Sequence, residues 1–514
     1  MRLAHNQALV IGGVASAMLL AAGAGSVLVV WRGAPGGAVL GRTASSALTF
    51  EVTVPKNTPP EDVIYIYTND QKGKRMEKIG PYSHRVALTK EQIGPLARGD
   101  TVRYRYTRNE ANFWTAEYLE PDTNDHFWTQ LGRTTRFVPG TVKRDVVSRW
   151  RWFPSESVPI VRTTKLTPTG TFRPRIGGQA WRSGQILEDL FVEGFRDHFA
   201  TTAAHLKKLG YRWVEIDPPW QWTEKNGWPR VANLVADNPN YPDDETLLTE
   251  IRAFKAAGLN VMLGPQLCCT GLSTQNRSGA WWDAYFAETT KFLGQMARLA
   301  ERADADAIHY AVSNDYNKSD ADQRWRAVFR AVQKNFSGDV GEMLWNFGST
   351  PGEIIPDADY ITWGDELDYF YIAIDTPLAR GDSPTDAELK EGAERMLDGV
   401  KQLYDRYQKP VFVRTAYNNV RQSWQGNAYY DISSIPWVSD PEQKLAKSKY
   451  AFGPHDQARV IQAYFRAIAE RPWVVGYAQF GYTHWEYPLA ADLSVRGKPA
   501  EDLWRKWNEF IYRR

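Results

Sequence analysis

Carboxyl groups follow short apolar segments at several places in the chain. Asp217 comes directly after one such segment and is followed by Trp220 and Trp222, so a carboxylate stands beside two aromatic rings. Asp315 and Asp375 occupy similar positions after later segments. Carboxyl groups placed in this way can act as general acids and bases, and flat aromatic faces suit sugar rings. The pattern predicts Asp217, Asp315 and Asp375 as catalytic residues beside an aromatic wall.

Other polar and aromatic side chains near the ends of these segments are candidates for binding a substrate. They are Asn314, Trp220, Trp222, Gln266, Asn346, Arg414, Thr415, Tyr417, Gln479, Trp485 and Glu486. A structural interpretation competes with the functional one, because Asp217 and Asp375 could also cap helices or pair with arginines. The sequence leaves both interpretations open.

Several other chemistries find no support in the sequence. It contains no glycine-rich phosphate loop, nucleophile elbow or His-Glu-x-x-His segment. The adjacent Cys268 and Cys269 have no nearby histidine, so we expect free thiols and predict neither a metal nor a cofactor. The net charge is +2, without a basic tail, which argues against nucleic acid as a partner.

The elements that must position these residues alternate between apolar segments and amphipathic helices. Helical spacing of apolar residues is clear at residues 244–257 and 455–470. Eight strands alternating with helices predict an α/β fold, a (β/α)8 TIM barrel over residues 169–514, with its chemistry at the carboxyl ends of the strands. The eight predicted strands are residues 172–180, 212–216, 260–264, 307–312, 341–345, 369–374, 410–413 and 474–478.

Residues 47–140 show a different pattern of short alternating segments separated by turn residues. This pattern predicts an antiparallel β-sandwich, with strands at residues 48–54, 63–67 and 101–107. These spans resemble the starch-binding type of carbohydrate-binding module. The resemblance implies either a structural spacer or a glycan platform formed by Trp114, Phe127 and Trp128. Residues 141–168, which lack a clean period, predict a linker.

The start of the chain predicts a location outside the cytoplasm. Residues 8–30 carry no charge and are long enough to cross a hydrocarbon core of about 30 Å. We expect an N-terminal transmembrane helix that anchors the protein in the membrane, with a cleavable signal peptide as the alternative. Residues 31–46 are rich in small residues and predict a flexible spacer. The body is expected at the cell surface or in the extracellular or periplasmic space.

Several stretches of the predicted barrel resemble glycoside hydrolase family 113, which comprises mannanase-like barrels of a large retaining clan. In order, they are residues 205–210, 256–263, 409–411, 471–473 and 497–501. The resemblance covers nearly all of residues 172–507. It implies a TIM barrel that acts on a polysaccharide or oligosaccharide, with an acid/base Glu after the fourth strand and a nucleophilic Glu at the end of the seventh.

The sequence departs from the family pattern at both catalytic positions. Asp315 stands at the acid/base position, beside Asn314, which would hold a sugar hydroxyl, and Thr415 stands at the nucleophile position. A threonine hydroxyl without an adjacent base is a weak nucleophile. The enzyme could invert, with Asp315 as the acid and Asp217, Asp375 or Glu486 as the base. It could instead use one of these carboxylates as a displaced nucleophile, or retain binding alone.

The sequence thus predicts an extracytoplasmic glycoside hydrolase with altered catalytic residues. The alternatives are a non-catalytic glycan-binding or scaffold protein in a cell-surface complex, and a transglycosylase or other sugar-modifying enzyme. An insertion at residues 418–453 is expected to form a lid over the cleft, because long loops of this kind are usually functional or disordered. Its aromatic residues are Trp424, Tyr429, Tyr430 and Trp437.

Overall fold

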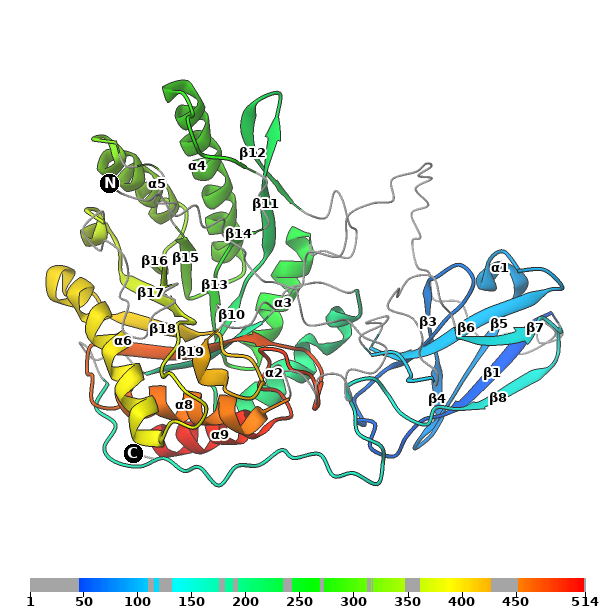
Figure 1. Ribbon diagram of the computed structural model, residues 1–514. Helices are drawn as coiled ribbons and strands as arrows, with labels where there is room; N and C mark the ends of the chain where they lie inside the picture. The colour runs from blue at the N-terminus through cyan, green and yellow to red at the C-terminus, as the bar shows by residue number, and fades with distance from the viewer. Residues whose placement is uncertain are drawn as a thin grey trace. The chain divides into compact units, whose positions relative to one another are not determined.

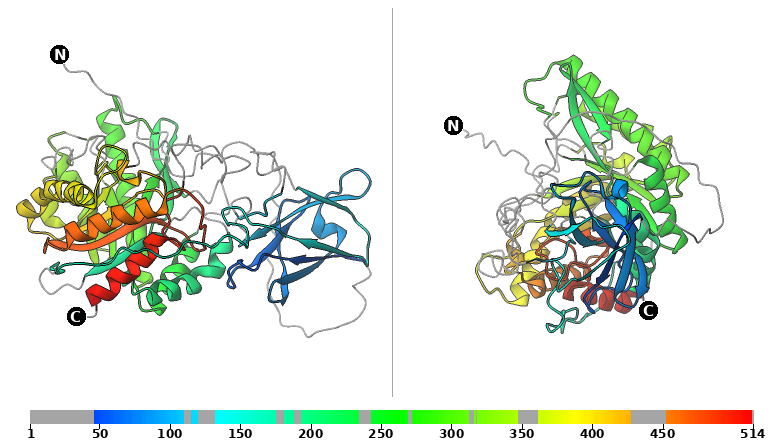
Figure 2. Two further views of the ribbon diagram at one scale, coloured as in Figure 1. Left: turned by 60° about the horizontal axis from the view of Figure 1, so that its bottom comes forward. Right: turned by 90° about the vertical axis from the view of Figure 1, so that its right-hand side faces the viewer.

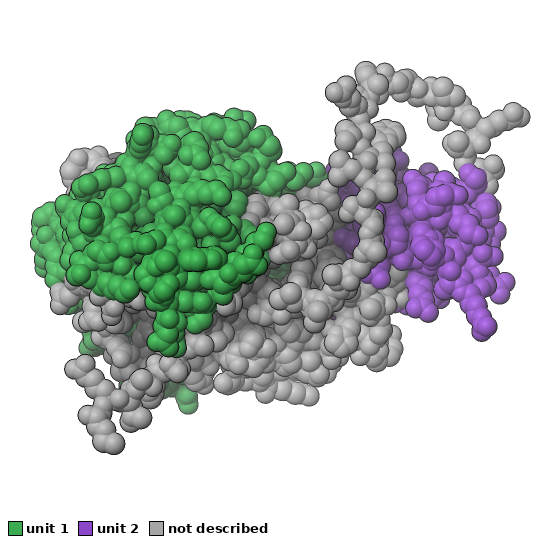
Figure 3. Space-filling view, turned by 90° about the horizontal axis from the view of Figure 1, so that it is seen from above, with its two compact units in different colours: residues 1–11, 160–436, 441–514 green, residues 12–159, 437–440 purple. Residues whose placement is uncertain are grey.

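The structure is a computed structural model. The chain divides into two compact units that meet in sequence between Pro159 and Ile160 (Figure 3). The predicted anchor at residues 8–30 lies outside the described residues, within which no helix is both long and apolar enough to span a bilayer. The structure describes residues 46–109, 115–119, 132–174, 181–187, 193–233, 243–268, 272–311, 316, 318–346, 361–426 and 452–512.

The N-terminal unit contains two four-stranded sheets, which Figure 2 shows in two orientations. The strand orders are β4-β5-β1-β8 and β3-β2-β6-β7, and a short helix, α1 (Lys90–Ile93), follows β5. The strands are β1 (Leu48–Thr53), β2 (Ile64–Tyr67), β3 (Gly73–Arg75), β4 (Glu77–Gly80), β5 (Ser83–Leu88), β6 (Thr101–Arg108), β7 (Arg133–Arg136) and β8 (Val142–Val146).

Aromatic side chains join the two sheets into a sandwich. The ring centres of Phe50 on β1 and Tyr104 on β6 lie 4.9 Å apart. The hydroxyls of Tyr104 and Tyr106 donate to Asp145 on β8 at 2.9 and 3.0 Å. The β-rich N-terminal unit predicted from sequence is therefore present. It is not antiparallel throughout, because β8 returns to the free edge of β1 in the same direction and pairs with it in parallel.

The predicted linker at residues 141–168 is not a single connecting segment. Its first part belongs to the sandwich, where β8 is a strand and the buried Trp150 indole donates to Thr58 at 2.8 Å. Its last part lies on the C-terminal unit, where the Thr164 backbone N–H donates to Asp502 at 3.1 Å. These hydrogen bonds decide where each domain ends, and composition alone does not reveal them.

The C-terminal unit is a closed barrel of eight parallel strands, as predicted (Figure 1). Around the barrel the order is β10-β13-β15-β16-β17-β18-β19-β9. Seven of the predicted segments coincide with barrel strands, and β17 has the predicted bounds. The strands are β9 (Arg182–Leu187), β10 (Trp213–Ile216), β13 (Asn260–Leu263), β15 (Ala307–Ala311), β16 (Asp339–Asn346), β17 (Tyr369–Ile374), β18 (Val411–Thr415) and β19 (Val474–Tyr482).

The first barrel strand differs from the prediction. Residues 172–174 form no regular structure, and the strand is β9, whose sequence begins with Arg182 and Ser183. Arg182 lies over the ring of Trp213, 4.4 Å from its centre, and donates to Asp339. These specific partners make burial of a polar strand possible, and they are invisible to a search for apolar segments.

Amphipathic helices cover the outside of the barrel (Figure 1). Several start at the capping residues their sequences favour: Asp243 caps α3, Ser278 caps α4 and Thr385 forms a capping box on α6. The helices are α2 (Phe199–Lys208), α3 (Asp244–Ala256), α4 (Gly279–Arg302), α5 (Ala321–Gln333), α6 (Asp386–Tyr407), α8 (Pro454–Ile468) and α9 (Pro499–Tyr512), with short 3-10 turns η2 (Glu193–His198), η5 (Gly364–Glu366) and η6 (Ser423–Gln425).

A small additional sheet extends the loops after β10 and β13. Strands β11 (Pro219–Lys225) and β12 (Trp228–Asn233) form a hairpin, and β14 (Gln266–Cys268) pairs with β11. Asn226 and Gly227 close the hairpin with φ of 53° and 79°, the left-handed conformations that an Asn-Gly turn favours. The hairpin lies beside α4 (Figure 1).

Candidate functional site

The interior of the barrel carries polar side chains near the C-terminal ends of four strands. Side chains two residues apart on a strand point to the same face, and Trp213, Ala307, Tyr369 and Phe412 form one apolar interior cluster. The polar residues follow these positions at two-residue spacing. We call them the polar centre: Glu215 and Asp217 from the end of β10, His309 from β15, Tyr371 from β17 and Arg414 from β18.

Close contacts join the members of the polar centre. His309 Nε2 lies 3.1 Å from Glu215 Oε1, and the Tyr371 hydroxyl donates to Glu215 Oε2. The rings of His309 and Tyr371 stack with centres 4.0 Å apart. Arg414 Nη1 lies 4.0 Å from Asp217 Oδ2. All five residues are buried, so these interactions are little screened by water.

A glycine makes room for the polar centre. Gly264 follows β13, and a Cβ atom added to it would lie 2.5 Å from Asp217 Oδ1. The same point is 2.7 Å from Glu215 Oε1 and 2.7 Å from His309 Nε2. Any larger residue would collide with all three side chains, so the centre requires glycine at this position.

Burial controls the charges of the polar centre. It raises the pKa of Glu215, and it raises the pKa of Asp217 well above its ordinary value, with the charge of Glu215 adding to the effect at Asp217. The guanidinium of Arg414 lowers both pKa values but does not cancel the burial. Burial also lowers the pKa of His309 to about 3, so the imidazole is neutral. Two touching carboxyl groups then share a proton, unless another cation takes its place.

Three members of the polar centre carry atoms that could hold a metal ion. Within the described part of the chain, the ligand atoms of Glu215, Asp217 and His309 lie within 4.8 Å of one another. Carboxylate oxygens and a neutral imidazole nitrogen are common ligands of zinc-like ions. The centre therefore has the chemistry to bind either a proton or a metal ion.

Two of the residues predicted from sequence belong to the polar centre. Asp217, a predicted catalytic residue, and Arg414, a predicted substrate-binding residue, face each other inside the barrel. Sequence reasoning missed Glu215, His309 and Tyr371. A signal was present, since Glu215 and His309 are the polar residues within otherwise apolar strands, and Glu215 stands two residues before Asp217 on the same face.

Thr415 does not face the interior of the barrel. Its hydroxyl donates to Gln479 Oε1 at 2.8 Å and lies 3.0 Å from the Tyr477 hydroxyl, and the side chain is fully buried. Because alternate residues of β18 point inward, the inward side chain at this end is Arg414. The expectation that Thr415 stands at the cleft in place of a nucleophile is wrong, because this side chain points away from the barrel interior and contacts Tyr477 and Gln479.

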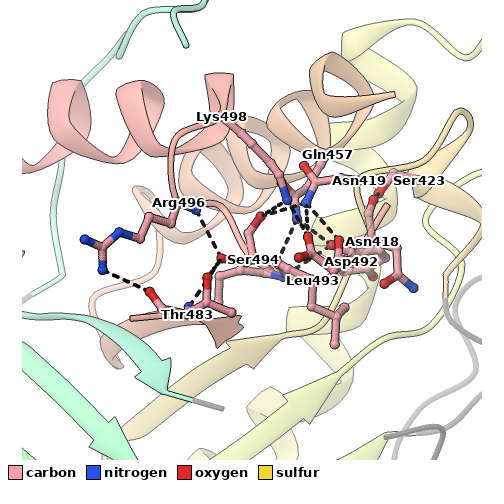
Figure 4. Close-up of polar contacts among 12 residues, drawn as sticks. Asn418, Asn419, Ser423, Gln457, Thr483, Asp492, Leu493, Ser494, Arg496 and Lys498 are labelled. Atoms are coloured by element: carbon pink, nitrogen blue, oxygen red, sulfur yellow. Dashed lines mark hydrogen bonds and ion pairs between the residues drawn. The ribbon is translucent and has the colours of Figure 1, made fainter. Parts of the chain in front are cut away.

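Tyr417 and Gln479 also have structural partners. The Tyr417 hydroxyl donates to the Thr376 carbonyl at 2.6 Å, and Gln479 accepts the bond from Thr415. Nearby, a polar network joins the loops after β18 and β19 to each other and to α8 (Figure 4). We call it the loop cage, and it consists of Asn419, Gln457, Asp492, Leu493, Ser494 and Lys498. The expected substrate-binding roles of Tyr417 and Gln479 are replaced by these structural contacts.

Neither the two tryptophans expected to form an aromatic wall, Trp220 and Trp222, nor the substrate-binding candidate Trp485 presents an open ring face. Trp222 stacks on Tyr285 with ring centres 4.5 Å apart, and Trp220 packs on Phe292 at 5.0 Å. Trp485 packs on Phe195 at 4.7 Å. All three tryptophans are less than a tenth exposed. They serve the core, because α4 packs on Trp220 and Trp222 and η2 packs on Trp485.

The remaining candidates lie elsewhere or outside the described residues. Glu486 accepts a hydrogen bond from Arg162 in an ion pair, and Asp375 is half-buried directly after β17. Trp424 of the expected lid is buried. The side chains of Gln266 and Asn346 are not among those described, and the following predicted residues lie outside the described ranges: Asn314, Asp315, Trp114, Phe127, Trp128, Tyr429, Tyr430 and Trp437.

The fold and the polar centre define an enzyme-type (β/α)8 barrel with acidic groups near the strand ends where such barrels hold their active sites. The model of Glycoside Hydrolase Family 113 matches residues 196–496, more than half of the 514-residue chain. The chain belongs to glycoside hydrolase family 113, and the resemblance found in the sequence is confirmed. Family membership supports hydrolysis of O-glycosyl bonds as its activity.

Two solved structures illustrate the similarity. A GH113 β-1,4-mannanase, solved as a complex, is 17% identical with a TM-score of 0.47, over 64% of this chain and 99% of the other. The GH113 β-mannanase AaManA from Alicyclobacillus acidocaldarius, in complex with ManMIm, is 16% identical with a TM-score of 0.48, over 65% of this chain and 98% of the other. A comparison with curated proteins found no match.

Proposed function

We propose that the protein hydrolyses glycosidic bonds of a polysaccharide at the C-terminal end of its barrel. The observation that carries the proposal is the concentration of carboxyl groups near that end, in a chain of family 113. Hydrolysis of a glycosidic bond requires two carboxyl groups with separate roles. Asp217, Asp375 and Asp315 all come from segments at that end of the barrel strands.

We assign the two roles to Asp315 and Asp375. Asp315 is the general acid, as the family pattern implies for the segment after β15. Asp375 is the base, because it follows β17 directly and is half-buried, which leaves it access to water. Asp217 is another candidate base from the sequence, but its carboxylate is buried against Glu215 and Arg414. It is better suited to shape the floor of the site.

We further propose that hydrolysis inverts the anomeric carbon. A retaining enzyme of this clan needs a nucleophilic carboxylate on the seventh strand, β18. Here the inward residue is Arg414, and Thr415 packs outside the strand. Water activated by Asp375 would then attack in a single displacement while Asp315 protonates the leaving oxygen.

The experiment incubates the purified full-length protein with β-mannan, starch, β-glucans and cell-wall polymers. New reducing ends identify the substrate, and NMR of the first product identifies its anomeric configuration. Asp315→Asn and Asp375→Asn should each abolish turnover with binding preserved, because each removes a proton-transfer group. Asp382→Asn, an exposed change in the loop after β17, is the matched control and should retain activity. Full activity in Asp375→Asn would contradict the assignment.

One observation favours a second candidate function, a non-catalytic glycan-binding or scaffold protein. The inward position at the end of β18 carries the cation Arg414, and the position that holds the clan's nucleophile carries Thr415. Polymer binding without new reducing ends across the whole panel would support this alternative and contradict hydrolysis.

The location and the role of the sandwich form part of the proposal. We place the protein outside the cytoplasm, held at the membrane by residues 8–30, on the basis of that uncharged segment. We also propose that the sandwich binds glycan in the manner of a starch-binding module. Membrane fractionation of the full chain and starch-affinity electrophoresis test the two statements separately.

A further inference from the structure

We propose that Glu215, Asp217 and His309 together bind one divalent metal ion inside the barrel. The proposal concerns occupancy of the polar centre and does not depend on whether the protein hydrolyses a glycan. Three ligand atoms surround one point, two of them have no hydrogen-bond partner, and neighbouring tyrosine hydroxyls fix their orientation.

The three ligand atoms surround one point. That point is where a Cβ of Gly264 would lie, 2.5 Å from Asp217 Oδ1 and 2.7 Å from both Glu215 Oε1 and His309 Nε2. An ion placed from this point toward the three side chains would reach bond lengths of about 2.0–2.2 Å. The 3.1 Å between Nε2 and Oε1 matches the separation of adjacent ligands around an ion with such bonds, which is about 3.0–3.4 Å. The absence of a side chain at position 264 keeps this space open.

Two of the ligand atoms lack a hydrogen bond. Glu215 is 3% exposed and His309 is 1% exposed, yet Glu215 Oε1 and His309 Nε2 have no hydrogen-bond partner. The two atoms lie 3.1 Å apart but form no hydrogen bond with each other. Buried polar atoms nearly always have a partner. A metal ion at the common point would satisfy both atoms at once.

Tyrosine hydroxyls next to the ligands fix the orientation of the His309 and Glu215 side chains. The Tyr369 hydroxyl donates to the Ile308 carbonyl at 3.2 Å, and its oxygen lies 3.4 Å from His309 Nδ1. The oxygen of that hydroxyl is then the acceptor for an Nδ1 proton, which leaves Nε2 with a lone pair toward the centre. The Tyr371 hydroxyl occupies Glu215 Oε2 and leaves Oε1 for the ion. Such outer contacts are typical of metal-binding histidines and carboxylates.

Charge and ligand type select the class of ion. Two carboxylates bring two negative charges, and Arg414, 4.0 Å from Asp217, offsets one of them. A divalent ion therefore suits the centre better than a trivalent one. One imidazole with two carboxylates favours Zn²⁺ or Mn²⁺ over Ca²⁺ and Mg²⁺, which prefer oxygen ligands alone.

The test measures metal content directly. Full-length protein is stripped with EDTA, checked for native near-UV circular dichroism, and dialysed against Zn²⁺ or Mn²⁺ before elemental analysis. We expect one ion per chain and a rise in Tm of about 5 °C at saturating metal. His309→Gln should lose the ion. The matched control is His205→Gln, because His205 also lies 3.1 Å from a carboxylate, that of Glu501, but outside the centre; it should keep the ion.

A second variant covers the case in which His309→Gln fails to fold. Gly264→Ala places a methyl group at the common point, and it should reduce bound metal at least tenfold in whatever fraction remains folded. Folded wild-type protein that binds no stoichiometric ion would overturn the proposal, even if it hydrolyses a glycan, and would assign a shared proton to the centre. Equal metal loss in His205→Gln would also overturn it. Stoichiometric binding without turnover supports the metal site and contradicts only the proposed hydrolysis.

Discussion

The polar centre and the loop cage are both buried polar groups in the same barrel, but their hydrogen bonding differs. In the loop cage, the Asn419 amide donates to the carbonyls of Asp492 and Ser494 at 2.8 and 2.7 Å (Figure 4). Gln457 donates to the Leu493 carbonyl at 3.0 Å, and Lys498 donates to Asp492 and to the Ser494 carbonyl. The side-chain nitrogens of the cage thus meet backbone or carboxylate oxygens. Two oxygens of the cage, Asn419 Oδ1 and Gln457 Oε1, have no hydrogen-bond partner, but the nitrogen of each amide is bonded.

The polar centre differs in the position of its unpaired atoms. Its acceptor atoms converge on a point beside Gly264, and Glu215 Oε1 and His309 Nε2 meet no donor. A network that matches donors to acceptors stabilises the loops it joins. A network with unmatched acceptors costs stability unless something else binds there. The convergence of the ligand atoms on one open point, and not the lack of partners alone, therefore distinguishes the centre from the cage.

Breaking the loop cage should have the largest effect on stability. Lys498 is buried, and Lys498→Met removes the cation paired with the Asp492 carboxylate and one of the two side-chain donors to the Ser494 carbonyl. We expect a loss of about 3–5 kcal/mol in the free energy of unfolding, measured by urea denaturation. Lys334→Met, at an exposed helix end, should change it by less than about 0.5 kcal/mol. Equal losses in the two variants would contradict the structural role of the cage.

Thr415→Glu tests whether the side chain at position 415 faces the core or the polar centre. A glutamate there would be buried against Tyr477 and Gln479 and would not reach the polar centre. We expect a loss of about 2–4 kcal/mol in the free energy of unfolding, with no gain in reducing-end release. Thr362→Glu, an exposed position before η5, is the control. A stable variant with new retaining activity would show that the side chain at this position faces the site after all.

Glu342 is a buried carboxyl group outside the polar centre. It shows how a buried acid that binds only a proton changes the free energy of unfolding with pH. Burial raises its pKa to about 8, although Trp363 donates to it at 2.7 Å. The folded state holds this proton more tightly than the unfolded state, in which the group has an ordinary pKa. Its stabilising contribution is thus full below about pH 4.5 and is lost as pH rises through 8, by ~1.4 kcal/mol per pH unit. Glu342→Gln should flatten this dependence in urea titrations at pH 5 to 9, whereas an unchanged slope would contradict the shift.

Arg414→Met should have a smaller and more specific effect, which is measured as metal affinity. Removing a cation 4.0 Å from Asp217 leaves more negative charge for a metal ion. We expect Zn²⁺ to bind about tenfold more tightly, from an electrostatic gain of roughly 1–2 kcal/mol. Competition with a fluorescent chelator measures the change. Weaker binding in Arg414→Met would mean that the guanidinium orders the ligands and does not oppose the ion.

The strands illustrate what could be predicted from the sequence. The strand at Tyr369–Ile374 has an apolar run that matches its burial on both faces, and the prediction gave its bounds. The first barrel strand could not be found in this way, because Arg182, Ser183 and Gln185 are buried only through partners on other elements. Hydropathy reports the transfer of a side chain into an apolar interior, and it contains no information on a distant hydrogen-bond partner.

The site shows the same division. The sequence by itself determined the barrel, because eight apolar segments alternate with amphipathic helices, and it identified Asp217 and Arg414 as residues of the C-terminal strand ends. The tertiary structure alone decided which face each side chain takes and which partners it meets. The tertiary structure buries Thr415 and three tryptophans in the core. It also places the side chains of Glu215 and His309, which are 94 residues apart in the chain, 3.1 Å from each other. Register and strand order set these distances, and neither is written in the local sequence.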